Sequence, residues 1–203
     1  MSSGIRIVSI ACTLLVAAAA VWLVSRRVDT FVLVDAALVD PRFSTSPAQM
    51  RDLGTPMALR PFAVRAHRLR HGQGTIYAYR AFHRGEWLAI DDETYRKLTL
   101  WTAAPVPEHE TQWRLGDDRR IVAIYTRGGS AWPDRACTGR IRQGTLRVRP
   151  RWRGVHVEVH GRIDAPCADR EIAVTFDASP LDFDALTPWL GLPAEHPYAE
   201  TYR

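Results

Sequence analysis

A chain of 203 residues has room for one ordinary domain and a membrane anchor, but not for two full domains. Its apolar fraction of 46% and charged fraction of 24% are those of a globular protein and exclude wholesale disorder. The net charge of +5 rests on arginine, because Lys97 is the only lysine and the arginines are spread along the chain. We therefore interpret them as solvated strand faces rather than a phosphate-binding patch, and a nucleic-acid partner is not favoured.

The first segment, 1–27, is predicted to be a membrane anchor or signal segment. Residues 7–24 carry no charge, and eighteen helical residues span about 27 Å, close to the hydrocarbon thickness of a bilayer. Arg26 and Arg27 follow directly, where the interface is expected. The apolar run is longer than the core of a usual signal peptide, which favours an uncleaved anchor. The alternative is secretion after cleavage near Ala20.

Residues 28–72 are expected to connect the anchor to the domain. Their beginning, 29–40, contains two short apolar runs split by Asp35. This pattern fits a strand pair, one bent strand or a continuation of the anchor helix, and its β-branched residues favour strand. A short helix is predicted at 46–53, because Ser46 can cap its first turn.

The remainder, 73–203, is predicted to be a β-rich domain with a proline-rich tail. Apolar runs of strand length, most of them alternating with polar residues, occur at 75–82, 121–125, 137–149, 155–160 and 171–176. Short strands with turn signals between them and little helix predict a mainly β fold, an antiparallel sandwich or a partial barrel.

Two stretches of this domain are expected to depart from plain strand. Residues 91–101 keep helical spacing at first and then alternate, so a helical turn followed by a strand is expected there. The tail is too rich in proline for a long regular element. We expect it to run extended, with a helical turn near 182–186, and to wrap the domain with its aromatic residues.

Cys137 and Cys167 bracket the most strand-rich segment and are predicted to form a disulfide. Neither has a second cysteine at metal-ligand spacing, which excludes a zinc ribbon. Behind an anchor or export segment, two cysteines are more often a bridge than free thiols, and the bridge would stabilise the fold by roughly 3–4 kcal/mol. The prediction is a single-pass inner-membrane protein whose C-terminal domain faces the periplasm. The alternative is two unrelated buried cysteines in a cytoplasmic domain.

The sharpest chemical pattern is His156-Val-Glu158-Val-His160. On a strand, the three polar side chains project from one face while the valines pack inward. Two histidines at this spacing, with a carboxylate, can share a zinc ion. The preferred alternative is an exposed face on which Glu158 meets cross-strand arginines such as Arg147 or Arg149. No cofactor is expected, and the sequence has no motif of the common hydrolases or nucleotide-binding proteins.

The segment Arg151-Trp152-Arg153 is predicted to be an interaction site. Pro150 before it and Gly154 after it indicate a chain reversal, which puts the three large side chains at the tip of a hairpin. Burying Trp152 would draw both arginines toward the core, which their solvation disfavours. An exposed tryptophan between two cations suits another protein's surface or a lipid headgroup region. The direction of the hairpin relative to the anchor decides between the two.

Together these features predict a membrane-anchored bacterial envelope protein, held in the membrane by residues 7–24. Its β-domain is expected to bind or assemble with another envelope protein without catalysing a reaction. Two alternatives stay open. One is a membrane-anchored, metal-dependent hydrolase that uses His156, Glu158 and His160; the other is a basic module that binds anionic lipid or nucleic acid.

Overall fold

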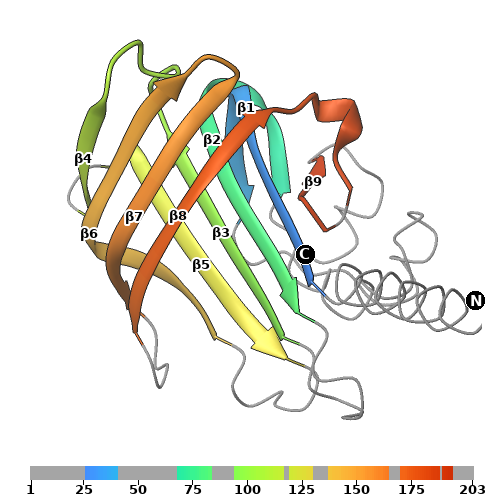
Figure 1. The fold of residues 1–203 in the computed structure, drawn as a ribbon, viewed down its shortest axis with the longest axis vertical. Coiled ribbons are helices and arrows are strands. Elements are labelled where there is room, and N and C mark those ends of the chain that lie inside the picture. The colour runs from blue at the N-terminus through green and yellow to red at the C-terminus, as the bar shows by residue number, and fades with distance from the viewer. Residues whose placement is uncertain are drawn as a thin grey trace, which may run out of the picture.

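The computed structural model describes residues 26–40, 68–83, 94–116, 119–129, 137–164, 170–187 and 189–193. These residues form a mainly β structure in which seven strands close into a barrel (Figure 1). The mainly β prediction is confirmed, and the sheet closes rather than forming a sandwich or a partial barrel. The predicted anchor at 1–27 lies outside the described residues except for its last two, and the predicted helix at 46–53 lies wholly outside them. Among the residues described, no helix is long and apolar enough to cross a bilayer.

The barrel wall follows the order β1-β8-β7-β6-β5-β3-β2, and β2 pairs with β1 to close it. Neighbouring strands are antiparallel except where β8 meets β1. β4 pairs beside β6, and β9 pairs beside β2. The elements are β1 (Arg26–Asp40), β2 (Arg68–His83), β3 (Thr94–Thr102), β4 (Thr111–Leu115), β5 (Ile121–Gly129), β6 (Cys137–Arg151), β7 (Gly154–Asp164), β8 (Glu171–Pro180), the 3-10 turn η3 (Phe183–Ala185) and β9 (Leu192–Pro193).

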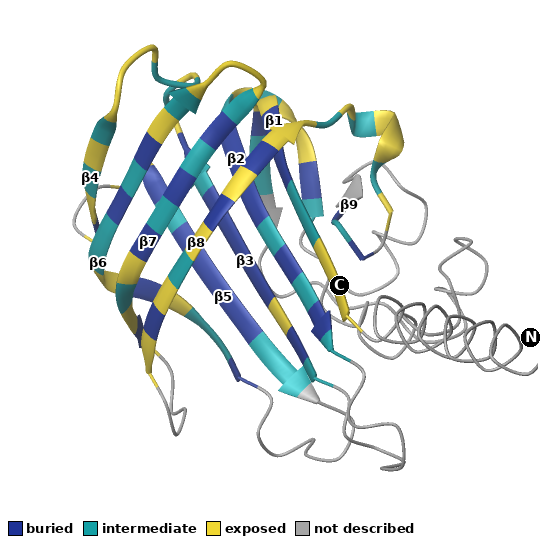
Figure 2. Ribbon diagram, in the orientation of Figure 1, coloured by how far each residue is buried: buried dark blue, intermediate teal, exposed yellow. Residues whose placement is uncertain are grey.

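The interior of the barrel is the main core of the protein. Alternate residues along each strand point inward, so buried and exposed bands alternate along β6, β7 and β8 (Figure 2). On β7 the inward residues are Val155, Val157 and Val159, as their spacing predicted. They pack with side chains from the other strands, including Tyr77, Leu98, Leu100, Tyr125, Leu146, Val148 and Phe176.

β1 is one bent strand, which settles the three alternatives left open for 29–40. Asp35 has a φ of 50°, a left-handed conformation that aspartate tolerates better than most residues. The register shifts there: Val34 lies opposite Thr75, and Ala36 lies opposite His71. The start of the segment assigned as a connector is therefore part of the barrel wall.

A second apolar layer lies outside the barrel, over β1, β2 and β3. It is covered by the chain that follows β8, residues 181–187 and 189–193, which we call the strap. Phe31, Leu33, Leu69, Ile76 and Ala78 pack there against leucines of the strap and Phe183. Phe82 and Tyr95 pack there against Trp189. The described part of the expected wrapping tail is thus present, with its turn at η3, while residues 194–203 lie outside the described residues.

The strand predicted at the end of 91–101 is present as β3, but it begins already at Thr94, where a helical turn was expected; residues 91–93 lie outside the described residues. Described from Thr94 onward, β3 is a continuous strand buried on both faces. Leu98 and Leu100 point into the barrel, while Lys97, Thr99 and Trp101 alternate with them on the strap side. Burial on both faces removes the period-2 contrast, which is why the pattern resembled a helix.

Candidate interaction site

The hairpin between β6 and β7 carries the most exposed large apolar side chain named among the described residues. Arg151 pairs with Gly154, so Trp152 and Arg153 alone form the connection. Trp152 is 87% exposed, and the guanidinium carbon of Arg153 lies 4.7 Å from the centre of its ring. Arg151, Trp152 and Arg153, hereafter the tip, therefore project together into solvent, as predicted.

Backbone geometry fixes the tip in this position. Gly154 has a φ of 155°, and a Cβ at this residue would lie 2.0 Å from the carbonyl oxygen of Ala178. Only glycine allows so close an approach between the hairpin and β8. Val155 then turns into the barrel core, which leaves Trp152 no route inward.

Ion pairs hold the tip against β8. The Arg151 Nε lies 3.4 Å from Asp177 Oδ1, and the same oxygen contacts His156 Nδ1 at 2.7 Å. The hydrogen bond from His156, with a smaller contribution from the charge of Arg151, holds the pKa of the Asp177 carboxyl below its usual range. Asp177 thus remains a carboxylate that links the tip to the outer face of the barrel.

The His156, Glu158 and His160 side chains lie on the outer side of β7, as their alternation predicted. His156 Nε2 lies 3.4 Å from Glu158 Oε1, and Arg147 Nη1 lies 3.4 Å from Glu158 Oε2. The expected cross-strand contact of Glu158 is therefore present. Across the described residues, no group of three or more His, Cys, Asp or Glu side chains is placed to hold a metal ion. The zinc site stays a prediction without structural support.

The other arginines of this face also have acidic partners. Arg149 Nε donates to Glu110 Oε2 at 2.8 Å, and Arg147 Nε lies 3.5 Å from Glu110 Oε1. The hydrogen bond from Arg149 lowers the pKa of the Glu110 carboxyl. These pairs neutralise part of the arginine charge on the face, as expected for a solvated strand surface rather than a phosphate-binding patch.

The tip lies at the end of the barrel opposite the start of β1. Arg26 pairs with His83, so β1 begins where β2 ends. β3 begins and β5 ends at that same end, and β6 begins beside β5 there. β6 then runs for 15 residues, roughly 50 Å of strand, to reach the tip. In Figure 1 the β6–β7 hairpin is at the top, and the first residues of β1 lie low on the right.

Cys137 is buried at the first position of β6, while Cys167 lies outside the described residues. The strand register brings the end of β7 to this part of β6, because Arg140 pairs with Asp164. The disulfide between the two cysteines stays a prediction.

Sequence reasoning missed a buried pair of cations under the strap. Arg80 on β2 and Lys97 on β3 are register partners, and each is 1% exposed. The available signal was the presence of a long cationic side chain within an apolar strand, at the chain's only lysine. This signal could not be interpreted from the sequence, because the strap that buries the two cations lies far along the chain and local periodicity does not predict where it packs.

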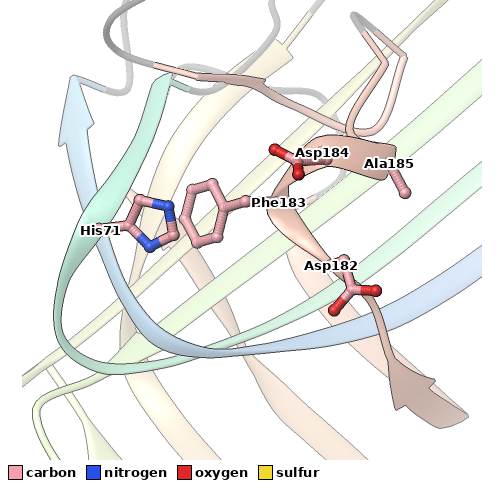
Figure 3. A pocket seen from close by; sticks show the side chains of 5 residues that line it. All are labelled: His71, Asp182, Phe183, Asp184 and Ala185. Carbon is pink, nitrogen blue, oxygen red and sulfur yellow. The ribbon is translucent and has the colours of Figure 1, made fainter.

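At least two cavities open to the surface of the described structure. One, of about 560 Å³, lies beside η3 and is lined by His71, Asp182, Phe183, Asp184 and Ala185. There the rings of His71 and Phe183 lie next to each other, with centres 4.1 Å apart and planes tilted by 32° (Figure 3). The other, of about 150 Å³, is lined by residues that include Trp113 and Arg120 near the barrel mouth. Neither contains the His-Glu-His group, so the hydrolase alternative gains no support from them.

Comparison with protein-family models, with curated proteins and with solved structures finds no match to this chain. Function must therefore be inferred from the site itself.

Proposed function

We propose that this chain is a membrane-anchored protein of the bacterial envelope that binds another envelope protein through its tip. The observation that carries the proposal is the 87% exposure of Trp152 on a short hairpin whose backbone is held against β8. A rigid, exposed tryptophan is a common anchor in protein interfaces, since it buries a large area at little entropic cost.

The position of the tip favours a protein over the anchoring bilayer as its partner. If residues 7–24 lie in the membrane, the start of β1 is the end of the barrel nearest to it. The tip then points away from that membrane, at the far end of β6. A tryptophan that dipped into the same bilayer would need to lie beside the anchor instead.

The proposed compartment is the periplasm, with secretion after cleavage near Ala20 as the alternative. The predicted disulfide between Cys137 and Cys167 would support it, because such bridges persist in oxidising compartments. The register is compatible with the bridge, since Asp164, the last described residue before Cys167, pairs with Arg140 near the start of β6.

The experiment is to measure the size of the native complex, using full-length protein extracted from membranes in a mild detergent. We expect the wild type to migrate in an assembly larger than its own detergent-bound mass. Trp152→Ala should migrate at its own mass, while its thermal unfolding midpoint stays within about 2 °C of the wild type.

Arg162→Ala provides the matched control, because this residue is exposed on β7 at the opposite end from the tip. It should leave the assembly intact. Equal migration of the wild type and Trp152→Ala would reject the proposed function. A loss of several kcal/mol of stability in Trp152→Ala would show that the residue supports the fold instead.

A further inference from the structure

The strap is fixed to the barrel by Trp189. This side chain is 1% exposed, and its indole Nε1 donates a hydrogen bond to Asp29 Oδ2 at 2.7 Å. Its ring meets that of Phe82 edge to face, with centres 6.5 Å apart. The strap therefore seats an aromatic side chain in a closed apolar layer over β1, β2 and β3.

Arg80 joins the strap to the sheet beneath it. Its Nε and Nη2 both donate to the carbonyl oxygen of Leu190, at 3.1 and 2.9 Å. Its Nη1 donates to the carbonyls of Leu98 and Tyr79, and its Nη2 also donates to Thr99 Oγ1. Every donor is therefore used. Burial lowers the pKa of Arg80 to about 9 against the opposing effect of Asp29, so the guanidinium stays charged at neutral pH.

Lys97 lies beside Arg80 and has no such partners. Its Nζ is buried without a hydrogen-bond partner among the described residues, 4.7 Å from the centre of the Trp189 ring and 6.0 Å from that of Tyr95. Burial, and next the charge of Arg80, lower the pKa of the Lys97 amine well below its usual range. An ammonium group there would have lost its water and gained only the faces of the Trp189 and Tyr95 rings, whose attraction for a cation is weaker than the hydration that it replaces.

We propose that the strap is a latch that loosens as the pH falls, because seating Trp189 over Lys97 requires the lysine to be uncharged. The other described titratable or charged groups around Lys97 are Arg80 on β2, Asp29 beside it on β1 and Tyr95 on β3. Its partner on β5 is Thr126, which carries no charge. This latch is independent of the tip and does not rest on the proposed function.

The direction of the pH dependence follows from proton uptake. With the strap open, Lys97 contacts water and is protonated below about 10.5. With the strap closed, the amine is neutral down to its lowered pKa. Opening therefore binds one proton between these two values, and the open population rises up to tenfold for each pH unit of decrease. Below the lowered pKa both states are protonated, and the dependence ends.

The test is hydrogen exchange of the full-length protein between pH 6 and 8, a range below the pKa of about 9 of Arg80, in which its guanidinium stays mainly charged. The amides of Leu190 and Gly191 report on the strap, because both donate to the Thr187 carbonyl, at 2.9 and 2.8 Å. Amides of β7 serve as the reference for global unfolding. After correction for intrinsic exchange, protection of the strap in the wild type should rise with pH by up to tenfold per unit.

Two substitutions of Lys97 separate its charge from its size. Lys97→Met is neutral at every pH and similar in volume, so strap protection should be high and nearly flat with pH. Lys97→Arg is charged at every pH, so protection should be low and flat. His71, which stacks on Phe183 of the strap, is present in all three proteins, and any slope it causes remains in Lys97→Met.

A wild-type profile as flat as that of Lys97→Met would overturn the proposal. So would an equal slope in both proteins, which would assign the effect to another group. If the β7 amides show that Lys97→Arg is globally unfolded, the comparison between the wild type and Lys97→Met still decides the question.

Discussion

Arg80 and Lys97 lie side by side in one apolar layer, but they differ in the hydrogen-bond acceptors that they find there. The guanidinium finds acceptors for all its donors, and the ammonium finds none. The planar guanidinium, with five donors, can reach carbonyls of neighbouring segments in several directions. A compact ammonium cannot reach them. We expect the first residue to stabilise the fold and the second to make it depend on pH.

Replacing Arg80 tests the first half of this view. Arg80→Leu removes the five donors and leaves the carbonyls of Leu98 and Leu190 without them, so we expect a loss of about 3–5 kcal/mol of unfolding free energy. Chemical denaturation measures it. The control Arg162→Leu, at an exposed position of β7, should change the midpoint little. Equal effects of the two substitutions would show that the buried hydrogen bonds of Arg80 contribute little to the free energy of unfolding.

The His156, Glu158 and His160 set gives a second residue-scale prediction. His156 already contacts Asp177 and Glu158 through its two ring nitrogens, which leaves no free nitrogen for a metal without rearrangement. We therefore expect equimolar zinc to leave the melting temperature unchanged, and the double variant His156→Gln, His160→Gln to melt close to the wild type. Stabilisation by zinc that disappears in the double variant would establish a metal site.

At the scale of the element, the β6–β7 hairpin depends on one glycine. Gly154→Ala would force a Cβ against the Ala178 carbonyl at a φ that L residues rarely adopt. We expect it to destabilise the protein by about 1–3 kcal/mol and to loosen the tip. Trp152→Ala, in the same hairpin, should leave stability nearly unchanged. If Gly154→Ala melts like Trp152→Ala, the tip is not held by this contact.

The sequence predicts some of these elements well and others poorly, for identifiable reasons. β7 has one solvent-facing and one buried face. The alternation of polar and apolar residues therefore predicted both the strand and the direction of its side chains. The tip was predictable because a proline and a glycine flank it. The first part of β3 was predicted as a helical turn, because the strap covers the face that would otherwise be polar. Closure between β1 and β8 and the burial of Arg80 depend on distant contacts that no local pattern encodes.

At the scale of the molecule, the predicted bridge between Cys137 and Cys167 bears on the proposed compartment. Thiol labelling of the denatured protein, alkylated before and after reduction, should show two cysteines that react only after reduction. We expect Cys137→Ser to make Cys167 react without reductant. The bridge would also stabilise the fold by roughly 3–4 kcal/mol, so reduction should lower the unfolding midpoint. Ready labelling of both cysteines before reduction would reject the bridge and weaken the periplasmic assignment.

The barrel separates its two ends by the full length of β6, and the proposed function depends on that separation. One end receives the chain from the predicted anchor, and the other presents Trp152. A partner at the tip must therefore reach the protein from beyond the barrel, at a distance from the anchoring membrane. A crosslink from the tip itself tests this arrangement most directly.

The decisive measurement is photocrosslinking in intact cells, with a photoreactive phenylalanine analogue in place of Trp152 and, separately, in place of Arg162. We predict a discrete protein adduct from position 152 that position 162 does not give, and the same partner should be lost from the native complex of Trp152→Ala. A lipid adduct at 152, or the same adducts from both positions, would contradict the account.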